Sequence, residues 1–296
     1  MMSCGLLSQK KLFDQYLGKS DRPLSCYHFS SVFAWKEFFE FSFDVVHDRL
    51  CVFAAHQGGR FLYLPPLGGD LDLSTVQECF KRMGKSKLAR VENISDNQLP
   101  AFNGRAYNTC LKSNEYVYAR EDLETLSGSR YKSKRHDVHL FRKKHPGAAL
   151  RPYVPADMKG CGALYRRWAN TRRRQNSDPV FLAMLEDNEA VHALLLANIT
   201  PLELVARVVD VDEEIAGYTL GYAVDDQTFC VALEITDLDK KGLGAYIFNA
   251  FCTDEEVRPF AWINTMDDFG MPGVAESKNS YHPMKRLAVY SVTQGA

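Results

Sequence analysis

Three strand-like runs separated by two acidic turns constrain the fold of this chain more than any other feature. Residues 202–210, 215–224 and 228–236 are rich in apolar and β-branched side chains. The connections between them contain Asp212-Glu213-Glu214 and Asp225-Asp226-Gln227. Because short polar connections join neighbouring antiparallel strands, the sequence predicts a three-stranded meander.

The segments around this meander complete a recognisable order of elements. A strand at 149–154 and helices at 156–173 and 177–198 precede it, and Asp178-Pro179 marks the start of the second helix. A helix at 244–254, a strand at 258–264, a glycine-rich loop and a strand near 286–292 follow it. This is the order of an acyltransferase domain of the GNAT type, so the second half predicts that α+β fold.

The first half gives a looser version of the same order. Residues 25–43 carry eight aromatic side chains from Tyr27 onward and predict one core helix. Three short strands, a helix at 73–83 and a strand at 87–92 follow. We therefore expect tandem GNAT-like domains with mixed, mostly antiparallel sheets flanked by helices. The expected division is an N-terminal domain at 1–126, a basic connecting helix at 127–147 and a C-terminal domain at 148–296.

The connecting segment 127–147 is strongly cationic. Tyr131, Val138 and Phe141 have helical spacing, Ser127 is a predicted N-cap, and Pro146-Gly147 is a stop signal. A solvated linker helix explains this charge as well as a phosphate-binding site does. The segment contains one acidic residue, Asp137, and seven basic residues: Arg130, Lys132, Lys134, Arg135, Arg142, Lys143 and Lys144.

Composition narrows the function classes. The net charge of −1 indicates that any cationic surface is local. No run approaches the roughly 20 apolar residues of a membrane-spanning helix, and the first residues lack the apolar core of a signal peptide. The eight cysteines contain no CxxC pair and the histidines lack ligand spacing, so we expect reduced thiols in the cytoplasm and no metal site.

Three groups of residues are candidates for chemistry. Gly242 and Gly244 follow a predicted strand and open a helix, where backbone N–H groups can bind an anion, although a tight turn explains them too. Near the C-terminus, Asp268 could orient an amine, Tyr281 could protonate a leaving group, and Lys278 could steady an oxygen, although a polar turn is the alternative. The third group is five arginines that suit either a nucleic acid backbone or a solvated helix end: Arg166, Arg167, Arg172, Arg173 and Arg174.

Several of these segments together resemble the phosphatidylglycerol lysyltransferase C-terminal-domain-like family. The closest part is the run from Arg120 to Phe141, and the likeness extends over nearly the whole chain. It implies a tandem GNAT fold akin to Fem-type aminoacyltransferases, which use aminoacyl-tRNA as donor and an amine or hydroxyl as acceptor. The positions that match the family's motifs are Arg130, Lys134, Arg135, Glu234, Gly242, Asn264, Asp268, Gly270, Lys278, Ser280, Tyr281 and Pro283.

These observations predict a soluble acyl- or aminoacyltransferase with no certain cofactor. Its donor would be aminoacyl-tRNA or an acyl-CoA, and its acceptor stays open between a small molecule, a peptide and a lipid. The expected catalytic residues are Glu234, Asp268, Lys278 and Tyr281, and the expected donor-binding residues are Arg130, Lys134, Arg135, Gly242 and Gly244.

Two alternatives remain. One is a non-catalytic nucleic-acid or nucleotide-binding protein on a degenerate GNAT scaffold. Thr265 and Met266, which stand where the family has Arg-Glu, and Asp239 in the anion loop favour it. The other is an acetyl-CoA N-acetyltransferase.

Overall fold

The computed structural model describes residues 3–104 and 106–295, which form two compact units. The first unit comprises Met1–Tyr116, Asp267–Ala275 and Lys285–Ala296, and the second comprises Val117–Met266 and Glu276–Met284. The chain enters the second unit at Val117, and its last strand returns to the first. The basic segment 127–147 lies wholly within the second unit.

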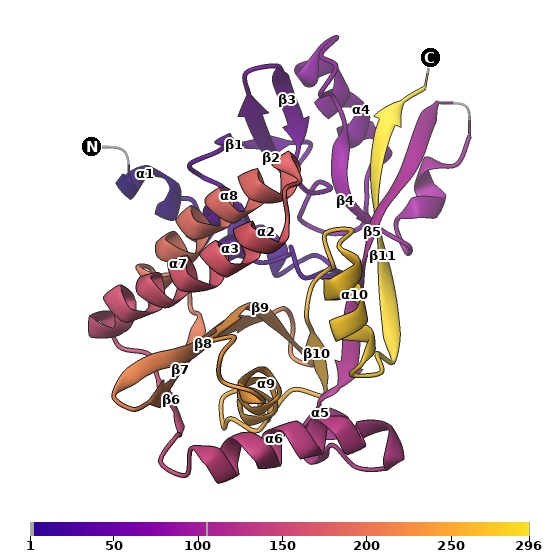
Figure 1. Cartoon of the computed structure of the whole chain (residues 1–296). Helices are drawn as coiled ribbons and strands as arrows, with labels where there is room; N and C mark the ends of the chain where they lie inside the picture. Colours follow the sequence, from indigo (N-terminus) through magenta and orange to yellow (C-terminus); the bar gives the residue numbers. More distant parts are fainter. Residues whose placement is uncertain (1–2, 105, 296) are drawn as a thin grey trace. The chain divides into compact units, whose positions relative to one another are not determined.

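The first unit contains a mixed sheet with helices around it (Figure 1). β2 pairs antiparallel with β1 and β3, β4 pairs antiparallel with β11, and β3 and β4 are parallel. The strand order is β1 (Glu40–Val46), β2 (Arg49–His56), β3 (Gly59–Leu62), β4 (Val91–Ser95), β11 (Lys285–Gln294) and β5 (Tyr107–Ala119). The helical elements are α1 (Ser3–Leu7), α2 (Lys10–Leu17), α3 (Phe29–Ala34), α4 (Leu73–Met83) and the 3-10 turn η1 (Leu99–Phe102).

The prediction of one aromatic helix over residues 25–43 is wrong. Helix α3 ends at Ala34, and β1 begins at Glu40. Phe39, Phe41 and Phe43 alternate with polar residues, which is the period of a strand, and aromatic side chains fit a pleated surface well.

The second unit contains the predicted meander, which is confirmed. β7 (Val205–Val211), β8 (Glu214–Ala223) and β9 (Thr228–Thr236) pair antiparallel in sequence order. β6 (Leu150–Pro152) pairs with β7, and β10 (Trp262–Asn264) lies between β9 and the end of β5. The helical elements are α5 (Arg120–Thr125), η2 (Ser129–Tyr131), α6 (Lys132–Lys144), η3 (Pro155–Asp157), α7 (Met158–Gln175), α8 (Pro179–Leu196), α9 (Leu243–Cys252) and the end of α10 (Pro272–Asn279).

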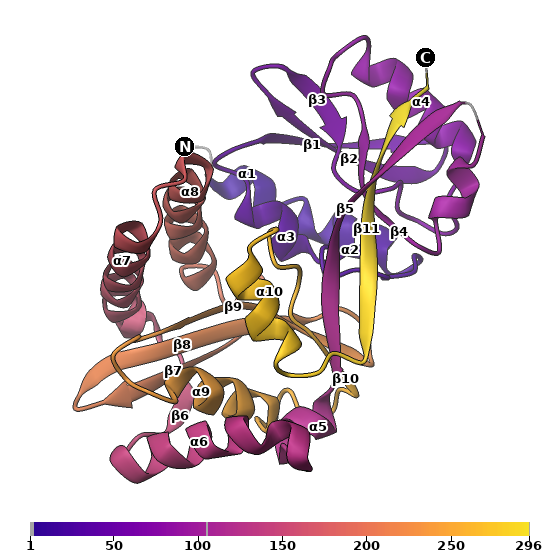
Figure 2. The same ribbon diagram turned by 45° about the vertical axis from the view of Figure 1, so that its right-hand side comes forward.

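Helices cover both faces of this second sheet. Figures 1 and 2 show α7 and α8 over one face and α9 over the other, with α6 packed outside α9. The core between α6, α9 and the sheet includes Phe141, Leu243 and Ile247. The basic segment therefore forms an amphipathic helix with a buried apolar side, as its spacing predicts.

Other local predictions divide between confirmed and wrong. Asp178 caps α8 by accepting hydrogen bonds from the backbone of Val180 and Phe181, as expected. Ser127 does not cap α6, which begins five residues later, at Lys132, with no side-chain cap. The expected glycine-rich loop contains α10. Among the described residues, no helix has the length and apolar character needed to cross a membrane.

Candidate functional site

The parallel pairing of β9 with β10 is short, and this opens an edge of β9. The pairs run only from Thr228 opposite Trp262 to Cys230 opposite Asn264. β9 continues to Thr236, and in the described strand pairs its remaining residues face only β8. An edge with free backbone donors and acceptors can bind an extended substrate.

Glu234 lies on this extension of β9. Its side chain is half-buried, and within the described structure its Oε2 is shielded from solvent without a hydrogen-bond partner. Burial raises the pKa of its carboxyl from 4.5 to about 8. Its cross-strand partner Thr219 is buried, and the Thr219 hydroxyl also lacks a partner among the described residues. Two unsatisfied polar groups on one face are uncommon in protein interiors and indicate a functional region.

Tyr281 is near enough to Glu234 for the Glu234 charge to raise the pKa of its hydroxyl. The residue is 9% exposed, and its ring packs edge-on against Phe248 of α9, with ring centroids 4.9 Å apart. Burial raises the pKa of the Tyr281 hydroxyl, and the charges of Glu234 and Cys252 raise it further. Tyr281 therefore keeps its proton at neutral pH.

Lys134 of α6 completes this cluster. Its Nζ lies 4.1 Å from the centroid of the Tyr281 ring. The side chain is half-buried, and burial lowers the pKa of its ammonium. Tyr131, in the 3-10 turn η2 just before α6, also contacts Tyr281. Its hydroxyl donates a hydrogen bond of 3.0 Å to the Tyr281 carbonyl oxygen. The structure thus brings together three predicted site residues, Glu234, Tyr281 and Lys134.

The glycines of the predicted anion loop have different surroundings. Gly242 has a φ of 87°, and a Cβ there would lie 2.3 Å from the carbonyl oxygen of Asp137 in α6. Glycine is therefore required for α6 to approach the start of α9. At Gly244 the nearest atom to a Cβ would be Thr236 Oγ1 at 3.8 Å, so that position has room.

The other predicted catalytic residues have structural contacts of their own. Lys278 in the second unit donates from Nζ to the carbonyl oxygens of Thr265 and, over 3.2 Å, of Met266. Asp268 belongs to the first unit, where its Oδ2 accepts a hydrogen bond of 2.5 Å from the Tyr116 hydroxyl. Its Oδ1 accepts a further one from the backbone of Gly270.

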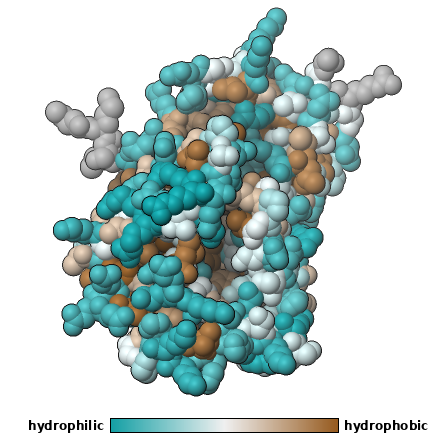
Figure 3. All heavy atoms as spheres, in the orientation of Figure 1, coloured by the Kyte–Doolittle hydropathy of each residue, from teal (hydrophilic) through white to brown (hydrophobic). Residues whose placement is uncertain are grey.

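Two of the predicted phosphate-binding cations also contact protein groups. Arg130 forms an ion pair of 2.8 Å with Asp122, and Arg135 donates to the carbonyl oxygens of Leu126 and Gly128. Figure 3 shows mostly hydrophilic side chains over the region where Figure 1 places α6. The exposed basic and imidazole residues on this helix are Lys132, Arg135, His136, His139, Arg142, Lys143 and Lys144.

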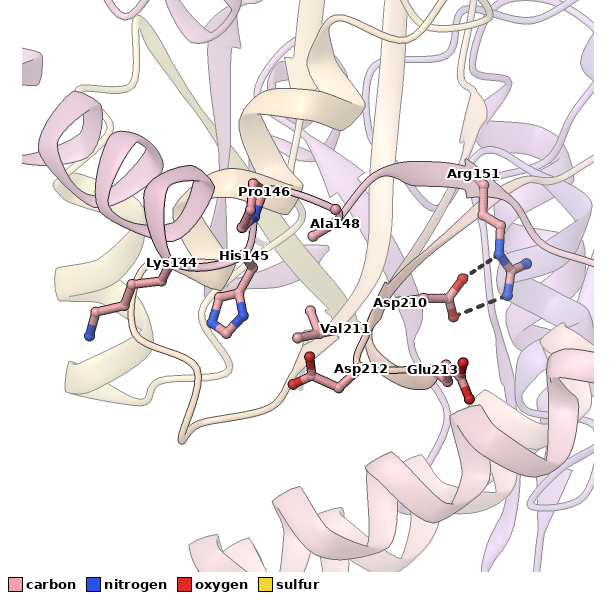
Figure 4. Close-up of a pocket in the computed structure, with 10 residues that line it drawn as sticks. Lys144, His145, Pro146, Ala148, Arg151, Asp210, Val211, Asp212 and Glu213 are labelled. Atoms are coloured by element: carbon pink, nitrogen blue, oxygen red, sulfur yellow. Dashed lines mark hydrogen bonds and ion pairs between the residues drawn. The ribbon is translucent and has the colours of Figure 1, made fainter.

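A cavity of about 540 Å³ lies at the C-terminal end of α6, among Lys144, Arg151 and the turn at Asp212 and Glu213 (Figure 4). Its arginine is already paired, because Arg151 contacts both Asp210 and Asp157. Figure 4 shows Lys144 extending away from Asp212. The residues that line this open cavity do not include a shielded group with a perturbed pKa like those of Glu234 and Tyr281.

Sequence reasoning missed Thr219, Phe248 and Cys252, which are neighbours of Glu234 or Tyr281. The apolar residues carry no signal that separates them from ordinary core. Thr219 is one polar residue in an apolar strand, and this was the available sign of a site.

Comparison with known proteins identifies the fold. The family model described as phosphatidylglycerol lysyltransferase, C-terminal, matches residues 20–293. The comparison with curated proteins found no match.

Solved structures match over most of the chain. A conserved protein of unknown function from Bacteroides thetaiotaomicron VPI-5482 has a TM-score of 0.85 and 23% identity, covering 97% of this chain and 96% of that one. L-PGS from Bacillus licheniformis has a TM-score of 0.64 and 12% identity, covering 86% and 84%. A tandem GNAT protein from the clavulanic acid biosynthesis pathway has a TM-score of 0.50 and 9% identity, covering 100% and 96%. The expected tandem GNAT fold is thereby confirmed.

Proposed function

Because this chain belongs to the phosphatidylglycerol lysyltransferase C-terminal family, we propose that it is an acyl- or aminoacyl-group transferase whose reacting groups include Glu234 and Tyr281. The observation that carries this proposal is their placement. A carboxyl and a phenol with perturbed pKa values lie together beside the open edge of β9. Paired acid and base groups of this kind are typical of proton-transfer sites.

The two side chains have complementary roles. The acceptor's nitrogen or oxygen attacks the carbonyl carbon of the donor, and the Glu234 carboxylate takes the acceptor's proton. The bond from that carbon to the leaving oxygen or sulfur breaks, and the leaving atom takes the proton of the Tyr281 hydroxyl. With a pKa of about 8, Glu234 is ionised in about one molecule in ten at pH 7. The transfer rate should therefore rise with pH and level off above about 8.

The proposed donor is aminoacyl-tRNA, and the family supports this choice. Exposed cations on α6 suit contacts with its phosphates. An acyl-CoA is the other donor class, and the start of α9 offers backbone N–H groups for its phosphates. Asp268 and Lys278 remain proposed site residues, each within its own unit.

A transfer assay tests the proposal directly. Purified protein is incubated with tRNA charged with labelled amino acids, or with labelled acetyl-CoA, and with an acceptor panel of lysine, ethanolamine, glycerol and phosphatidylglycerol vesicles. We expect Tyr281→Phe and Glu234→Gln to reduce transfer by about 100-fold or more. Tyr290→Phe on β11 and the exposed Glu213→Gln serve as matched controls and should retain activity. Transfer that is equal in all four variants would contradict the assignment.

A non-catalytic nucleic-acid-binding protein is the second candidate. The exposed cationic side of α6 and the engagement of Lys278 with backbone carbonyls favour it. RNA binding by the wild-type protein, with no transfer from any donor, would establish this function instead.

A further inference from the structure

Lys134 differs from the neighbouring basic residues of α6 in the solvent exposure of its side chain. Lys132, Arg135 and His136 are exposed, whereas Lys134 is half-buried. Burial lowers the pKa of its ammonium. Counterion release requires a cation that reaches the phosphate backbone of the partner, whereas the Lys134 ammonium lies over the Tyr281 ring. Lys134 is poorly placed for that role.

The Tyr281 ring occupies a defined position between two groups. Phe248 contacts it edge-on at 4.9 Å between centroids, and the Lys134 ammonium lies 4.1 Å from its centroid. Partial desolvation strengthens a cation–π contact of this geometry. The ring orientation therefore depends on Lys134.

The beginning of α6 is also tied to the backbone around Tyr281. The buried Tyr131 donates its hydroxyl proton to the Tyr281 carbonyl oxygen, and its ring lies 5.3 Å from that of His282. His282 Nε2 is 3.2 Å from the Arg130 carbonyl oxygen. Lys134 thus belongs to a set of contacts that fix one short segment against α6.

We propose that Lys134 is a positioning residue for proton transfer by Tyr281, and not a contact to donor phosphates. Its ammonium orients the ring in the resting protein. It then stabilises the phenolate that forms when the hydroxyl proton passes to the leaving atom. This inference rests on the proposed transferase function.

The experiment compares Lys134→Met, Lys134→Arg and the control Lys159→Met, an exposed lysine of α7, in two measurements. The first is transfer kinetics with the donor that supports turnover. We expect Lys134→Met to lower kcat by roughly 100-fold with little change in KM, and Lys134→Arg to recover about tenfold of this loss. Lys159→Met should leave kcat unchanged.

The second measurement is the salt dependence of unacylated tRNA binding. Removing one phosphate contact lowers the slope of log K against log salt concentration by about 0.7 to 0.9. We expect the slope to be unchanged in Lys134→Met. A reduced slope with kcat intact in that variant would overturn the inference. If the wild-type protein binds tRNA but transfers nothing, the proposed function fails, and the slope alone decides whether Lys134 is a phosphate contact.

Discussion

Replacing Glu234 by Gln should change how the stability of the second unit depends on pH. In the folded protein the pKa of this carboxyl is about 8, against 4.5 for the ordinary group. Between these pH values the folded state binds more protons than the unfolded state, so stability falls as pH rises. The stabilising contribution is complete below about pH 4.5 and is lost as the pH passes through 8.

The size of this effect follows from the two pKa values. The full difference corresponds to roughly 5 kcal/mol of the free energy of unfolding. Because the Glu234 side chain keeps part of its surface in water, we expect about 2–4 kcal/mol to be observed. This is a large share of the 5–15 kcal/mol typical of whole domains. A neutral glutamine of similar shape cannot titrate, so the variant should lack this loss.

The measurement is urea unfolding at pH 5.5, 7 and 9, monitored by tryptophan fluorescence. Trp168 and Trp262 lie in the second unit and report on its unfolding. The stability advantage of Glu234→Gln over wild type should be smallest at pH 5.5 and largest at pH 9. The exposed Glu213→Gln is the control and should track wild type. Parallel pH profiles for Glu234→Gln and wild type would refute the argument, since they would mean that the Glu234 carboxylate is well solvated.

Three further changes test other parts of the second unit, each by urea unfolding. Gly242→Ala should destabilise the unit by about 2–4 kcal/mol through backbone strain and contact with α6. Gly244→Ala should change stability by less than about 1 kcal/mol. Equal losses in the two variants would exclude the close approach of α6 to Gly242. Asp178→Ala should cost about 1 kcal/mol through loss of the α8 cap, and an unchanged midpoint would show that the cap adds nothing. Arg207→Met should cost about 3–5 kcal/mol, because it leaves the largely buried Asp254 carboxylate without its bidentate partner, and a neutral result would contradict that burial.

Sequence patterns predicted those parts of the fold in which local signals agree. The meander of β7, β8 and β9 has apolar strands and acidic turns, and its three strands appear within a few residues of the expected positions. The start of α8 carries both a capping aspartate and a proline, and it too was predicted correctly. In these segments each local preference favours the structure that forms.

The partition of the chain could not be predicted in the same way. β11 pairs with β4, placing Val289 opposite Ser95, and the sequence carries no local mark of a partner so far away. β5 is 13 residues long, although only its last part shows the alternation of a strand. Its earlier residues, such as Thr109, Lys112 and Asn114, are polar and hide the strand. Long-range pairing and exposed polar strands are outside the reach of periodicity arguments.

The position of Glu234 shows most clearly why the candidate site could not be predicted from the sequence alone. If β8 and β9 paired regularly from their connecting turn onward, Glu234 would lie opposite Tyr218. The Tyr218 hydroxyl contacts His192 of α8. In the structure an extra residue, Ala232, shifts the register, since Gly221 faces Val231 but Leu220 faces Leu233. A Cβ at Gly221 would lie 2.1 Å from the Cys230 carbonyl oxygen, so this irregularity needs glycine. One inserted residue reverses the face of every later side chain. It therefore places Glu234 opposite Thr219, on the α9 side with Tyr281, and the proposed chemistry depends on this bulge.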